Sequence, residues 1–341
     1  MKKLPINLGV DSYDIVIEDD LLFHLSFYIE KIYHNDKIFI VTDDNVSKYY
    51  LETVKKALAP RYNLEWVIFS SGETSKNFET YLKIIDELLA KNIRRNHLLL
   101  GLGGGVVGDI TGFVAATLYR GLPYVNVPTS LLSQMDSSIG GKTGIDYAGR
   151  KNIIGAFKQP KLVLIDPKTL NTLPQKEFNN GMGELIKHAL IGDIGLFTTL
   201  LTRPFINEDI IYESLLVKKK VVELDPYDQK ERMLLNFGHT FGHVIELKEN
   251  IKHGEAVGLG MLMAIKLGID LGITKADCLP LLSKLLELYD LPFELYNYKD
   301  YLEAVAQDKK NLAGVLNFIL IEDIAKPIMY PIEEKKLKEL L

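Results

Sequence analysis

Residues 97–109, His-Leu-Leu-Leu-Gly-Leu-Gly-Gly-Gly-Val-Val-Gly-Asp, run from an apolar segment through clustered glycines into a second apolar segment. Gly103, Gly105 and Gly108 match the pattern G-x-G-x-x-G. Such glycines let the backbone approach a pyrophosphate, and the N-terminus of a following helix offers unpaired N–H donors. The pattern alone fits a tight turn without a ligand equally well, but the order strand, turn, helix favours a dinucleotide. Because the fingerprint normally occupies the first such turn of a domain, we expect a non-standard binding mode.

The sequence around this turn alternates short apolar runs with amphipathic stretches. The apolar runs predict strands at 13–17, 37–42, 64–69, 97–102, 124–127 and 162–165. Helical patterns lie between most of them, at 20–33, 46–58, 76–91 and 106–119. This alternation predicts an α/β, Rossmann-like domain with a mainly parallel sheet, whose ligands lie on loops at the carboxyl ends of the strands.

The second half of the chain has a different pattern, in which helical periodicity predominates over strand signals. Helices are expected at 178–191, 209–224, 236–247, 255–271 and 276–289, and the next strand signal comes only at 316–321. The sequence Asn-Thr-Leu-Pro at 171–174 interrupts the pattern. We therefore expect an α/β domain over residues 1–173, followed by an all-α domain over residues 174–341.

Bulk composition limits the function classes. The chain has 341 residues, a formal net charge of −5, and 47% hydrophobic and 25% charged residues. The acidic balance argues against nucleic-acid or anionic-membrane partners. Cys278 is the single cysteine, which excludes an internal disulfide. Without a signal peptide pattern or a membrane-length apolar run, we expect a cytoplasmic protein.

Polar residues also follow two other predicted strands. Asp43 and Asn45 come after 37–42, where a carboxylate suits ribose hydroxyls, although such residues are common in turns for local reasons. Glu73 and Lys76 lie after 64–69, and Ser75 is expected to cap the next helix. Surface charge on a capped helix is the simpler interpretation of Glu73 and Lys76.

Residues 128–146 combine hydroxyl side chains, paired glycines and Lys142. Lys151 and Asn152 follow after another glycine-containing turn. Glycine pairs permit close approach of the backbone, and hydroxyls with a lysine hold phosphate or carboxylate. This density favours an anion site over a solvated polar loop.

A group of histidines and carboxylates lies in the helical half. His239, His243 and Glu246 share one face of a predicted helix, and His253 precedes the next helix. Glu184, Lys187 and His188 share a face of an earlier helix. Imidazole and carboxylate groups are zinc ligands, so the group favours a metal site, although spacing does not decide which two histidines bind it. A solvated basic face is the preferred interpretation of most of the cations at 218–220, 230 and 232.

Taken together and in this order, residues 103–109, 135–144, 183–188 and 235–243 resemble the 3-dehydroquinate synthase family. The resemblance extends over roughly residues 37–320. It implies an N-terminal Rossmann-like domain, a helical C-terminal domain, a homodimer, bound NAD and one zinc or cobalt ion. It also implies conversion of 3-deoxy-D-arabino-heptulosonate 7-phosphate into 3-dehydroquinate and phosphate. The steps would be transient oxidation by NAD, phosphate elimination, re-reduction and intramolecular aldol closure, within the shikimate pathway of aromatic amino acid biosynthesis.

The resemblance also assigns individual residues. The implied metal ligands are Glu184, His239 and His253. NAD would contact Asp43, Asn45, Glu73, Lys76, Gly104, Gly105, Val106, Asp109, Thr129, Ser130, Lys142 and Lys151. The substrate would contact Asp136, Lys142, Asn152, Lys187, Lys218, Arg232, Asn236, His243 and one lysine of the pair Lys309 and Lys310. Arg120 resembles an arginine that is donated across the dimer interface to the substrate phosphate.

Two segments depart from the family pattern, and other functions compete. Residues 225–231 differ from the usual acidic run, and the segment between His243 and His253 is short. A metal-dependent polyol dehydrogenase of related fold would produce net NADH, whereas the synthase would not. Another sugar-phosphate cyclase would differ at the carboxylate pocket, chiefly Lys218, Arg232 and Asn236. A non-catalytic NAD-binding protein would have no need of the metal ligands together with Lys142.

Overall fold

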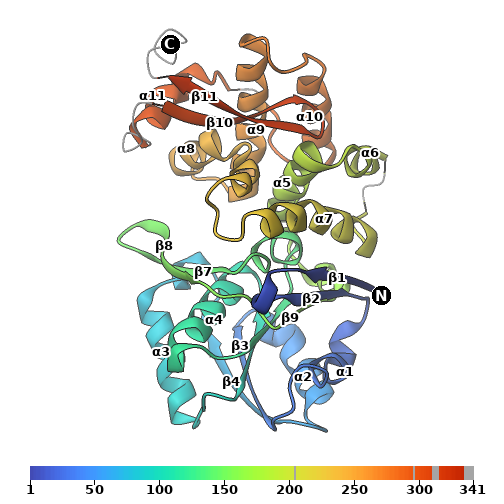
Figure 1. Cartoon of the computed structure of the whole chain (residues 1–341), viewed down its shortest axis with the longest axis vertical. Helices are drawn as coiled ribbons and strands as arrows, with labels where there is room; N and C mark the ends of the chain where they lie inside the picture. The colour runs from blue at the N-terminus through green and yellow to red at the C-terminus, as the bar shows by residue number, and fades with distance from the viewer. Residues whose placement is uncertain (203–204, 295, 309–314, 334–341) are drawn as a thin grey trace. The chain divides into compact units, whose positions relative to one another are not determined.

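The computed structural model describes residues 1–202, 205–294, 296–308 and 315–333 (Figure 1). The chain divides into two compact units. The first contains Met1–Pro174 and Asn207–Tyr212, and the second contains Gln175–Ile206 and Glu213–Leu341. Each unit is considered by itself below.

A seven-stranded sheet forms the centre of the first unit, in the order β1-β2-β9-β6-β5-β3-β4. β1 pairs antiparallel with β2, and all other neighbours are parallel. The strands are β1 (Lys2–Ile6), β2 (Tyr13–Ile17), β3 (Lys37–Asp43), β4 (Asn63–Phe69), β5 (Leu98–Gly103), β6 (Tyr124–Pro128) and β9 (Leu162–Ile165). The chain passes from β3 out to β4 and returns to β5 on the other side of β3, so the strand order reverses between β3 and β5.

Helices cover both faces of this sheet. They are α1 (Leu25–Ile29), α2 (Val46–Leu58), α3 (Phe78–Ala90) and α4 (Gly105–Thr117), with short helices η1 (Gly9–Asp11), η2 (Leu21–His24), η3 (Glu73–Ser75), η4 (Leu118–Arg120), η5 (Ser133–Ser137) and η6 (Pro167–Thr172). Side chains of β3 alternate between two separate cores: Ile38 and Ile40 pack in one, and Phe39 and Val41 in the other. A strand buried on both faces is apolar throughout, which explains the continuous apolar runs in the sequence.

An antiparallel hairpin, β7 (Lys142–Tyr147) and β8 (Arg150–Phe157), packs against α4 in the first unit. The preceding segment contains η5, a single π-helical turn over Ser133–Ser137. Gly140 and Gly141 follow with φ of 92° and 69°, a region that favours glycine. The predicted polar anion-binding segment is therefore a π-turn, a glycine turn and the first strand of a hairpin.

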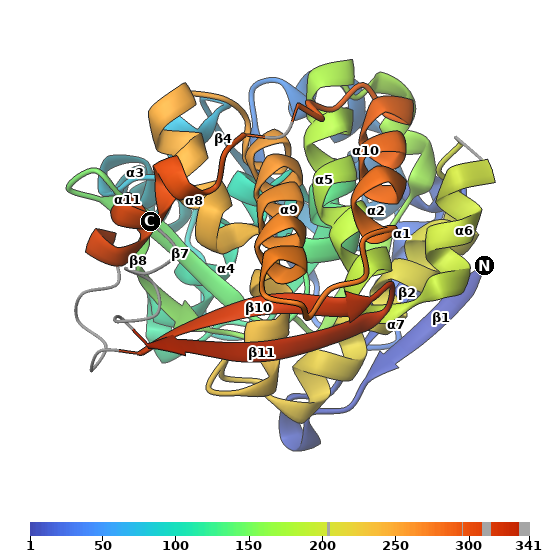
Figure 2. The ribbon, with the colours of Figure 1, turned by 90° about the horizontal axis from the view of Figure 1, so that it is seen from above.

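In its described residues, the second unit is mainly helical and also contains a β-hairpin. Its helices are α5 (Gln175–Gly192), α6 (Ile194–Thr202), the continuation of α7 (Glu208–Leu224), η7 (Glu231–Asn236), α8 (His239–Glu249), α9 (His253–Asp270), α10 (Cys278–Leu288) and α11 (Lys299–Asp308). β10 (Val315–Asp323) and β11 (Lys326–Glu333) form the antiparallel hairpin. Figure 2 shows α5, α9 and α10 side by side, with the hairpin beside α9. α9 is buried along most of its length and forms the centre of this unit.

The fold class predicted from the sequence is confirmed: an α/β unit with a largely parallel sheet precedes a helical part. Two details differ from the prediction. The second part is not all-α, because β10 and β11 pair in an antiparallel hairpin, and the cap expected at the start of α3 is wrong. Ser75 does not cap α3, because the helix begins only at Phe78 and Asn77 is its N-cap. The side chain of Asn77 accepts a hydrogen bond from the backbone N–H of Thr80 at 2.9 Å. In the described part of the chain, none of the helices combines the length and apolar character needed to cross a bilayer.

Candidate active site

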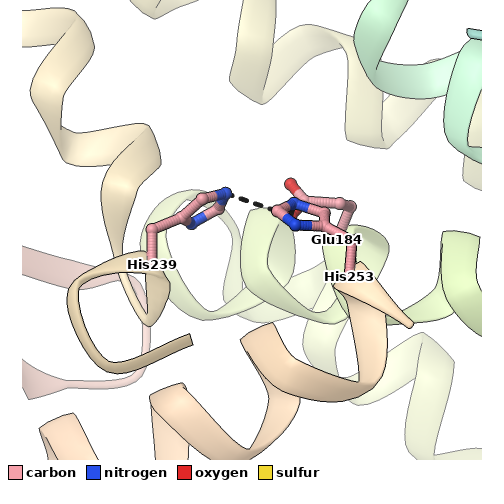
Figure 3. A group of neighbouring side chains, drawn as sticks. All are labelled: Glu184, His239 and His253. Carbon is pink, nitrogen blue, oxygen red and sulfur yellow. Dashed lines mark ion pairs between the residues drawn. The ribbon is translucent and has the colours of Figure 1, made fainter. Parts of the chain in front are cut away.

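Three helices of the second unit bring one carboxylate and two imidazole rings together (Figure 3). Oε1 of Glu184, on α5, lies 3.4 Å from Nε2 of His239 at the start of α8. The same oxygen lies 3.4 Å from Nε2 of His253 at the start of α9. The three ligand atoms lie within 4.8 Å of one another. One carboxylate oxygen and two imidazole nitrogens form a donor set that suits zinc and related divalent ions.

Glycine contacts between helices explain why these side chains meet. At the crossing of α5 and α9, a Cβ on Gly183 would lie 2.2 Å from the carbonyl oxygen of Gly254. A Cβ on Gly254 would in turn lie 2.0 Å from the carbonyl oxygen of Asn180. The two backbones touch here, and Glu184 and His253 are the chain neighbours of the two glycines. Only glycine permits this approach, so the crossing sets the position of two ligands.

A second close contact positions His239. A Cβ on Gly260 of α9 would lie 2.1 Å from the carbonyl oxygen of Gly238, the residue immediately before His239. Gly238 itself has φ of 79°, which favours glycine. The turn into α8 is therefore fixed against α9, and His239 leaves it towards Glu184.

The remaining polar atoms of the three ligands also have partners. Oε2 of Glu184 accepts a hydrogen bond from Nζ of Lys187, one turn along α5. Nδ1 of His239 lies 3.2 Å from the carbonyl oxygen of Phe237, and Nδ1 of His253 lies 3.0 Å from Oε2 of Glu246. Carbonyl and carboxylate oxygens accept, so each Nδ1 donates. Both rings therefore turn Nε2 towards Oε1 of Glu184.

In the absence of a metal, the pKa values of His239 and His253 are shifted in opposite directions. Burial, followed by the charge of Lys187, lowers the pKa of His239 to about 3. Burial also acts to lower the pKa of His253, but its hydrogen bonds with Glu184 and Glu246 raise that pKa to about 9. Metal ligands must be deprotonated, so His253 would have to lose a proton in order to hold a metal ion through Nε2.

His243 lies beside the group without joining it. Its ring centroid is 5.4 Å from that of His239 and 6.2 Å from that of His253. Among the described residues, the group of possible ligands around these rings contains Glu184, His239 and His253 but not His243. The assignment of His243 to the substrate rather than the metal stays a prediction that this position suits.

The segment that departs from the family pattern is organised by a carboxylate that sequence reasoning missed. Asp225 is buried and accepts hydrogen bonds from the backbone N–H groups of Gln229, Lys230 and Arg232, at 3.0, 2.6 and 3.2 Å. Although burial raises the pKa of Asp225, these three donors lower it below its ordinary value. Nη1 of Arg232 also donates to the carbonyl oxygen of Pro226 at 3.0 Å. An aspartate followed by Pro and several polar residues is the signal that could have indicated this turn.

Three of the predicted substrate cations in the second unit are buried: Lys187, Lys218 and Arg232. Asn236 ends η7, directly before the turn that carries His239. The preference for a solvated basic face is therefore wrong for Lys218 and Arg232, whereas Lys230 is exposed. Lys218 is on the apolar side of α7, which a scan for charge runs does not distinguish from its neighbours. Lys309 and Lys310 lie outside the described residues.

In the first unit, predicted cofactor residues gather where the strand order reverses. Asp43 ends β3, and Gly104 caps α4 directly after β5, the neighbour of β3. Gly104 has no side chain to bond the first-turn N–H groups of α4, which suits a phosphate there. Oδ1 of Asp43 accepts from the backbone N–H of Asn45 and Val46, at 2.9 and 2.7 Å. That local role is the one that the simpler interpretation of Asp43 anticipated.

Lys76 is buried and joins two other predicted site residues. Its Nζ pairs with Asp109 on α4 and donates to Oδ1 of Asn152 on β8, 2.5 Å away. Burial acts to lower the pKa of Lys76, but Asp109 and Glu73 raise it above its ordinary value. Surface charge is therefore the wrong interpretation of Lys76. Asn152, with φ of 53°, lies beside predicted cofactor residues although it was assigned to the substrate.

The other predicted residues of the first unit are dispersed over several elements. Thr129 is buried and its N–H donates to the carbonyl oxygen of Gly103 at 3.0 Å, and Ser130 bonds Ser133. Asp136 lies in the π-turn η5, Lys142 begins β7 and is exposed, and Lys151 is exposed on β8. Arg120 is exposed and has φ of 63°, directly after Tyr119 with φ of 53°.

Comparison with known proteins places these residues in a family context. The model of the 3-dehydroquinate synthase N-terminal domain matches residues 66–180, and that of the C-terminal domain matches residues 181–311. The 3-dehydroquinate synthase of Clostridium botulinum (strain Alaska E43 / Type E3) is 43% identical, over 96% of this chain and 97% of that protein.

Solved structures of sugar-phosphate cyclases share the fold. A 2-deoxy-scyllo-inosose synthase complexed with carbaglucose-6-phosphate, NAD+ and Co2+ is 22% identical, with a TM-score of 0.84 over 99% of both chains. The 2-epi-5-epi-valiolone synthase from Streptomyces hygroscopicus subsp. jinggangensis 5008, with NAD+ and Zn2+ bound, is 26% identical. Its TM-score is 0.85, over 96% of this chain and 95% of the other. With matches over almost its entire length, this chain belongs to the 3-dehydroquinate synthase family.

Proposed function

We propose that this chain uses NAD and one divalent metal ion to convert 3-deoxy-D-arabino-heptulosonate 7-phosphate into 3-dehydroquinate and phosphate, as a carbon–oxygen lyase. Family membership supports the reaction. The observation that carries the metal dependence is the convergence of Glu184, His239 and His253 within 4.8 Å.

The donor set fits zinc or cobalt. Glu184, His239 and His253 would hold the ion, and each has a further hydrogen bond that fixes its orientation. When bound, such an ion acts as a Lewis acid on hydroxyl oxygens of the substrate, and NAD supplies a reversible hydride acceptor. Lys187 holds the second oxygen of Glu184, so that only Oε1 faces the two imidazoles.

The cations of the site would bind the anionic groups of the substrate. Lys187, Lys218 and Arg232 are buried, and burying a charge is costly unless an opposite charge compensates for it. Lys187 already pairs with Glu184, and the carboxylate and phosphate of the substrate would add further anionic partners for these cations. The family resemblance assigns Asn236 and His243 to the substrate with them, and the two lie on either side of His239 along the chain. Asp136, Lys142 and Asn152 are assigned to it from the family pattern.

The residues at the carboxyl ends of β3, β4 and β5 would bind NAD. The cap-free start of α4 offers N–H donors to a pyrophosphate, and Asp43 offers an acceptor for ribose hydroxyls. Lys76 would exchange part of its pairing with Asp109 and Asn152 for the dinucleotide. Three further points stay predictions: that the protein is a homodimer, that Arg120 reaches the substrate phosphate of the neighbouring subunit, and that the protein is cytoplasmic.

The decisive experiment follows two signals in one reaction. Purified protein is incubated with the heptulosonate phosphate, NAD and zinc, while phosphate release and absorbance at the NADH wavelength are recorded together. We expect one phosphate for each substrate molecule and no net rise in NADH, because the hydride returns to the carbon skeleton. Stoichiometric NADH would instead indicate a polyol dehydrogenase. If neither phosphate release nor NADH were observed, both functions would be contradicted.

A second candidate is a different sugar-phosphate cyclase, which the two solved structures favour through their fold. The first of them is complexed with carbaglucose-6-phosphate, which lacks the carboxylate of the heptulosonate. The matched control is therefore glucose 6-phosphate under the same conditions. Phosphate release from this control, without release from the heptulosonate phosphate, would replace the proposed substrate.

A further inference from the structure

Glu246 is a half-buried carboxylate beside the metal-site group, and neither the family motifs nor the proposed reaction assigns it a role. Its side chain is 13% exposed, whereas the side chain of His253 beside it is 30% exposed. It lies on α8, on the same face as His239 and His243. Its Oε2 lies 3.0 Å from Nδ1 of His253. The opposite ring nitrogen of His253 faces Oε1 of Glu184 at 3.4 Å.

We propose that Glu246 is the positioning residue of the metal site: it fixes the ring orientation and tautomer of His253, so that Nε2 is presented to the metal. This inference rests on the proposed metal site of Glu184, His239 and His253. An ionised carboxylate has acceptors only, so a hydrogen bond to it places the proton on Nδ1. In the neutral ring, Nε2 then has its lone pair on the side of Glu184, where the metal would bind. Hydrogen bonds of this kind between a carboxylate and a ligating histidine tune both geometry and ligand basicity.

The position of His253 explains why it needs such support. It is the first residue of α9, directly after a short turn in which Asn250 has φ of 53°. Less of its ring is covered by packing than that of His239, which is 14% exposed. The capping interactions around it act on the backbone: Lys252 N–H donates to Glu255, and Gly254 N–H donates to Asn180. Among the hydrogen bonds described for the ring, the one to Glu246 holds the side away from the metal.

The two histidines are supported in different ways. Nδ1 of His239 donates to the carbonyl oxygen of Phe237 at 3.2 Å, a main-chain partner that no side-chain substitution removes. Nδ1 of His253 depends on a side chain instead. Of the two histidine supports, the one from Glu246 can therefore be removed by a side-chain substitution, and it also contributes a negative charge near the cation.

The test measures metal binding rather than turnover. Zinc dissociation constants of wild type, Glu246→Gln and Glu246→Ala are determined by competition with a chelating dye. We expect a loss of about tenfold for Glu246→Gln, whose amide oxygen still accepts, and nearer to about 100-fold for Glu246→Ala. The absorption spectrum of the cobalt-substituted protein should change as well, because it reports the ligand geometry, whereas a change in fold stability alone would leave it unaltered.

Glu249→Gln is the matched control. It removes one carboxylate from the same helix, where Glu249 accepts a hydrogen bond from Tyr301 at 3.2 Å rather than from a metal ligand. We expect its zinc affinity and cobalt spectrum to equal those of wild type. If both Glu246 variants also kept wild-type affinity and spectrum, or lost only thermal stability in the metal-free form, Glu246 would be a purely structural residue and the inference would be overturned.

The same measurements separate this inference from the proposed metal site. Stoichiometric zinc in wild type, lost in His239→Ala, supports the site whatever Glu246 does. Wild-type protein that binds no zinc would overturn the metal site and the role of Glu246 together. Should Glu246→Ala fail to fold, Glu246→Gln, which keeps the size of the side chain, carries the test.

Discussion

The histidine rings of the second unit lie close together, but their roles are expected to differ. Nε2 of His239 faces Glu184, whereas His243 is absent from the ligand group. We predict that His239→Ala loses stoichiometric zinc and turnover together, because two donors remain where three converge. His243→Ala should retain zinc and lose turnover. Metal content by atomic spectroscopy and phosphate release measure the two effects.

The opposite pattern would reassign the ligands. If His243→Ala lost zinc while His239→Ala kept it, the donor set described here would not be the metal site. A His239→Ala protein with full zinc content and full activity would contradict the assignment outright.

Residue patterns predicted part of this site from the sequence. The helical period predicted that His239, His243 and Glu246 share one face of a helix. All three residues lie in α8, so the helix that this prediction requires is present. Spacing left the choice of ligands open, because Glu184 and His253 come from other helices and only the family resemblance assigned them. The hydrogen bond between Glu246 and His253 was not foreseen, since it depends on the turn between α8 and α9. The resemblance to the family, and the function it named, are confirmed by the comparisons.

Two glycines at the crossing of α5 and α9 form the element that the metal site depends on most. We predict that Gly254→Ala lowers the free energy of unfolding by about 1–3 kcal/mol, which is the usual cost of overpacking a core. A Cβ there would lie 2.0 Å from the carbonyl oxygen of Asn180, and backbone cannot move aside as a side chain can. The displacement should also weaken zinc binding, since His253 precedes Gly254. Chemical denaturation and dye competition measure the two effects.

Gly258→Ala, one turn further along α9, is the control. A Cβ at Gly258 would lie 3.0 Å from Cδ2 of Leu286, the end of a flexible side chain. We expect a smaller loss of stability and unchanged zinc affinity. Equal effects of the two substitutions would show that the helix, rather than the crossing, determines the result.

Elements were predicted best where packing and local preference agree. α2, β2 and β9 have the expected bounds, and the predicted strands β3, β4, β5 and β6 differ from the structure by one residue at one or both ends. β7 and β8 were missed, because the sequence around Lys142 is rich in glycine and hydroxyl residues and the strand exists through its pairing with β8. β1 was missed as well: it is an edge strand with exposed residues that pairs only with β2.

On the scale of the whole molecule, the two proposed ligands bind to different units. The metal ligands come from α5, α8 and α9, whereas the proposed cofactor residues lie in the first unit. A ligand that binds only the folded state stabilises it, by about 2.7 kcal/mol at 100 times its dissociation constant. We predict that zinc and NAD each raise the melting temperature of wild type. In His239→Ala the zinc effect should vanish and the NAD effect should remain.

Thermal unfolding in the presence of each ligand measures this, with chelator-treated protein as the reference. An undiminished zinc effect in His239→Ala would place the stabilising ion elsewhere. Loss of both effects would show that the substitution unfolds more than the metal site.

The way in which the chain is divided between the two units determines what truncation or proteolysis would do to the protein. Residues 207–212 belong to the first unit although residues on both sides belong to the second, and Lys2 of β1 pairs with Asp209 at 2.6 Å. The polypeptide therefore passes from one unit to the other three times, and α7 contains one of these passages. A fragment that stops at Pro174 would lack the ionic partner of its own edge strand. After a cut at any one of these passages, at least one unit would still contain residues of both fragments, so the two fragments would separate only after denaturation.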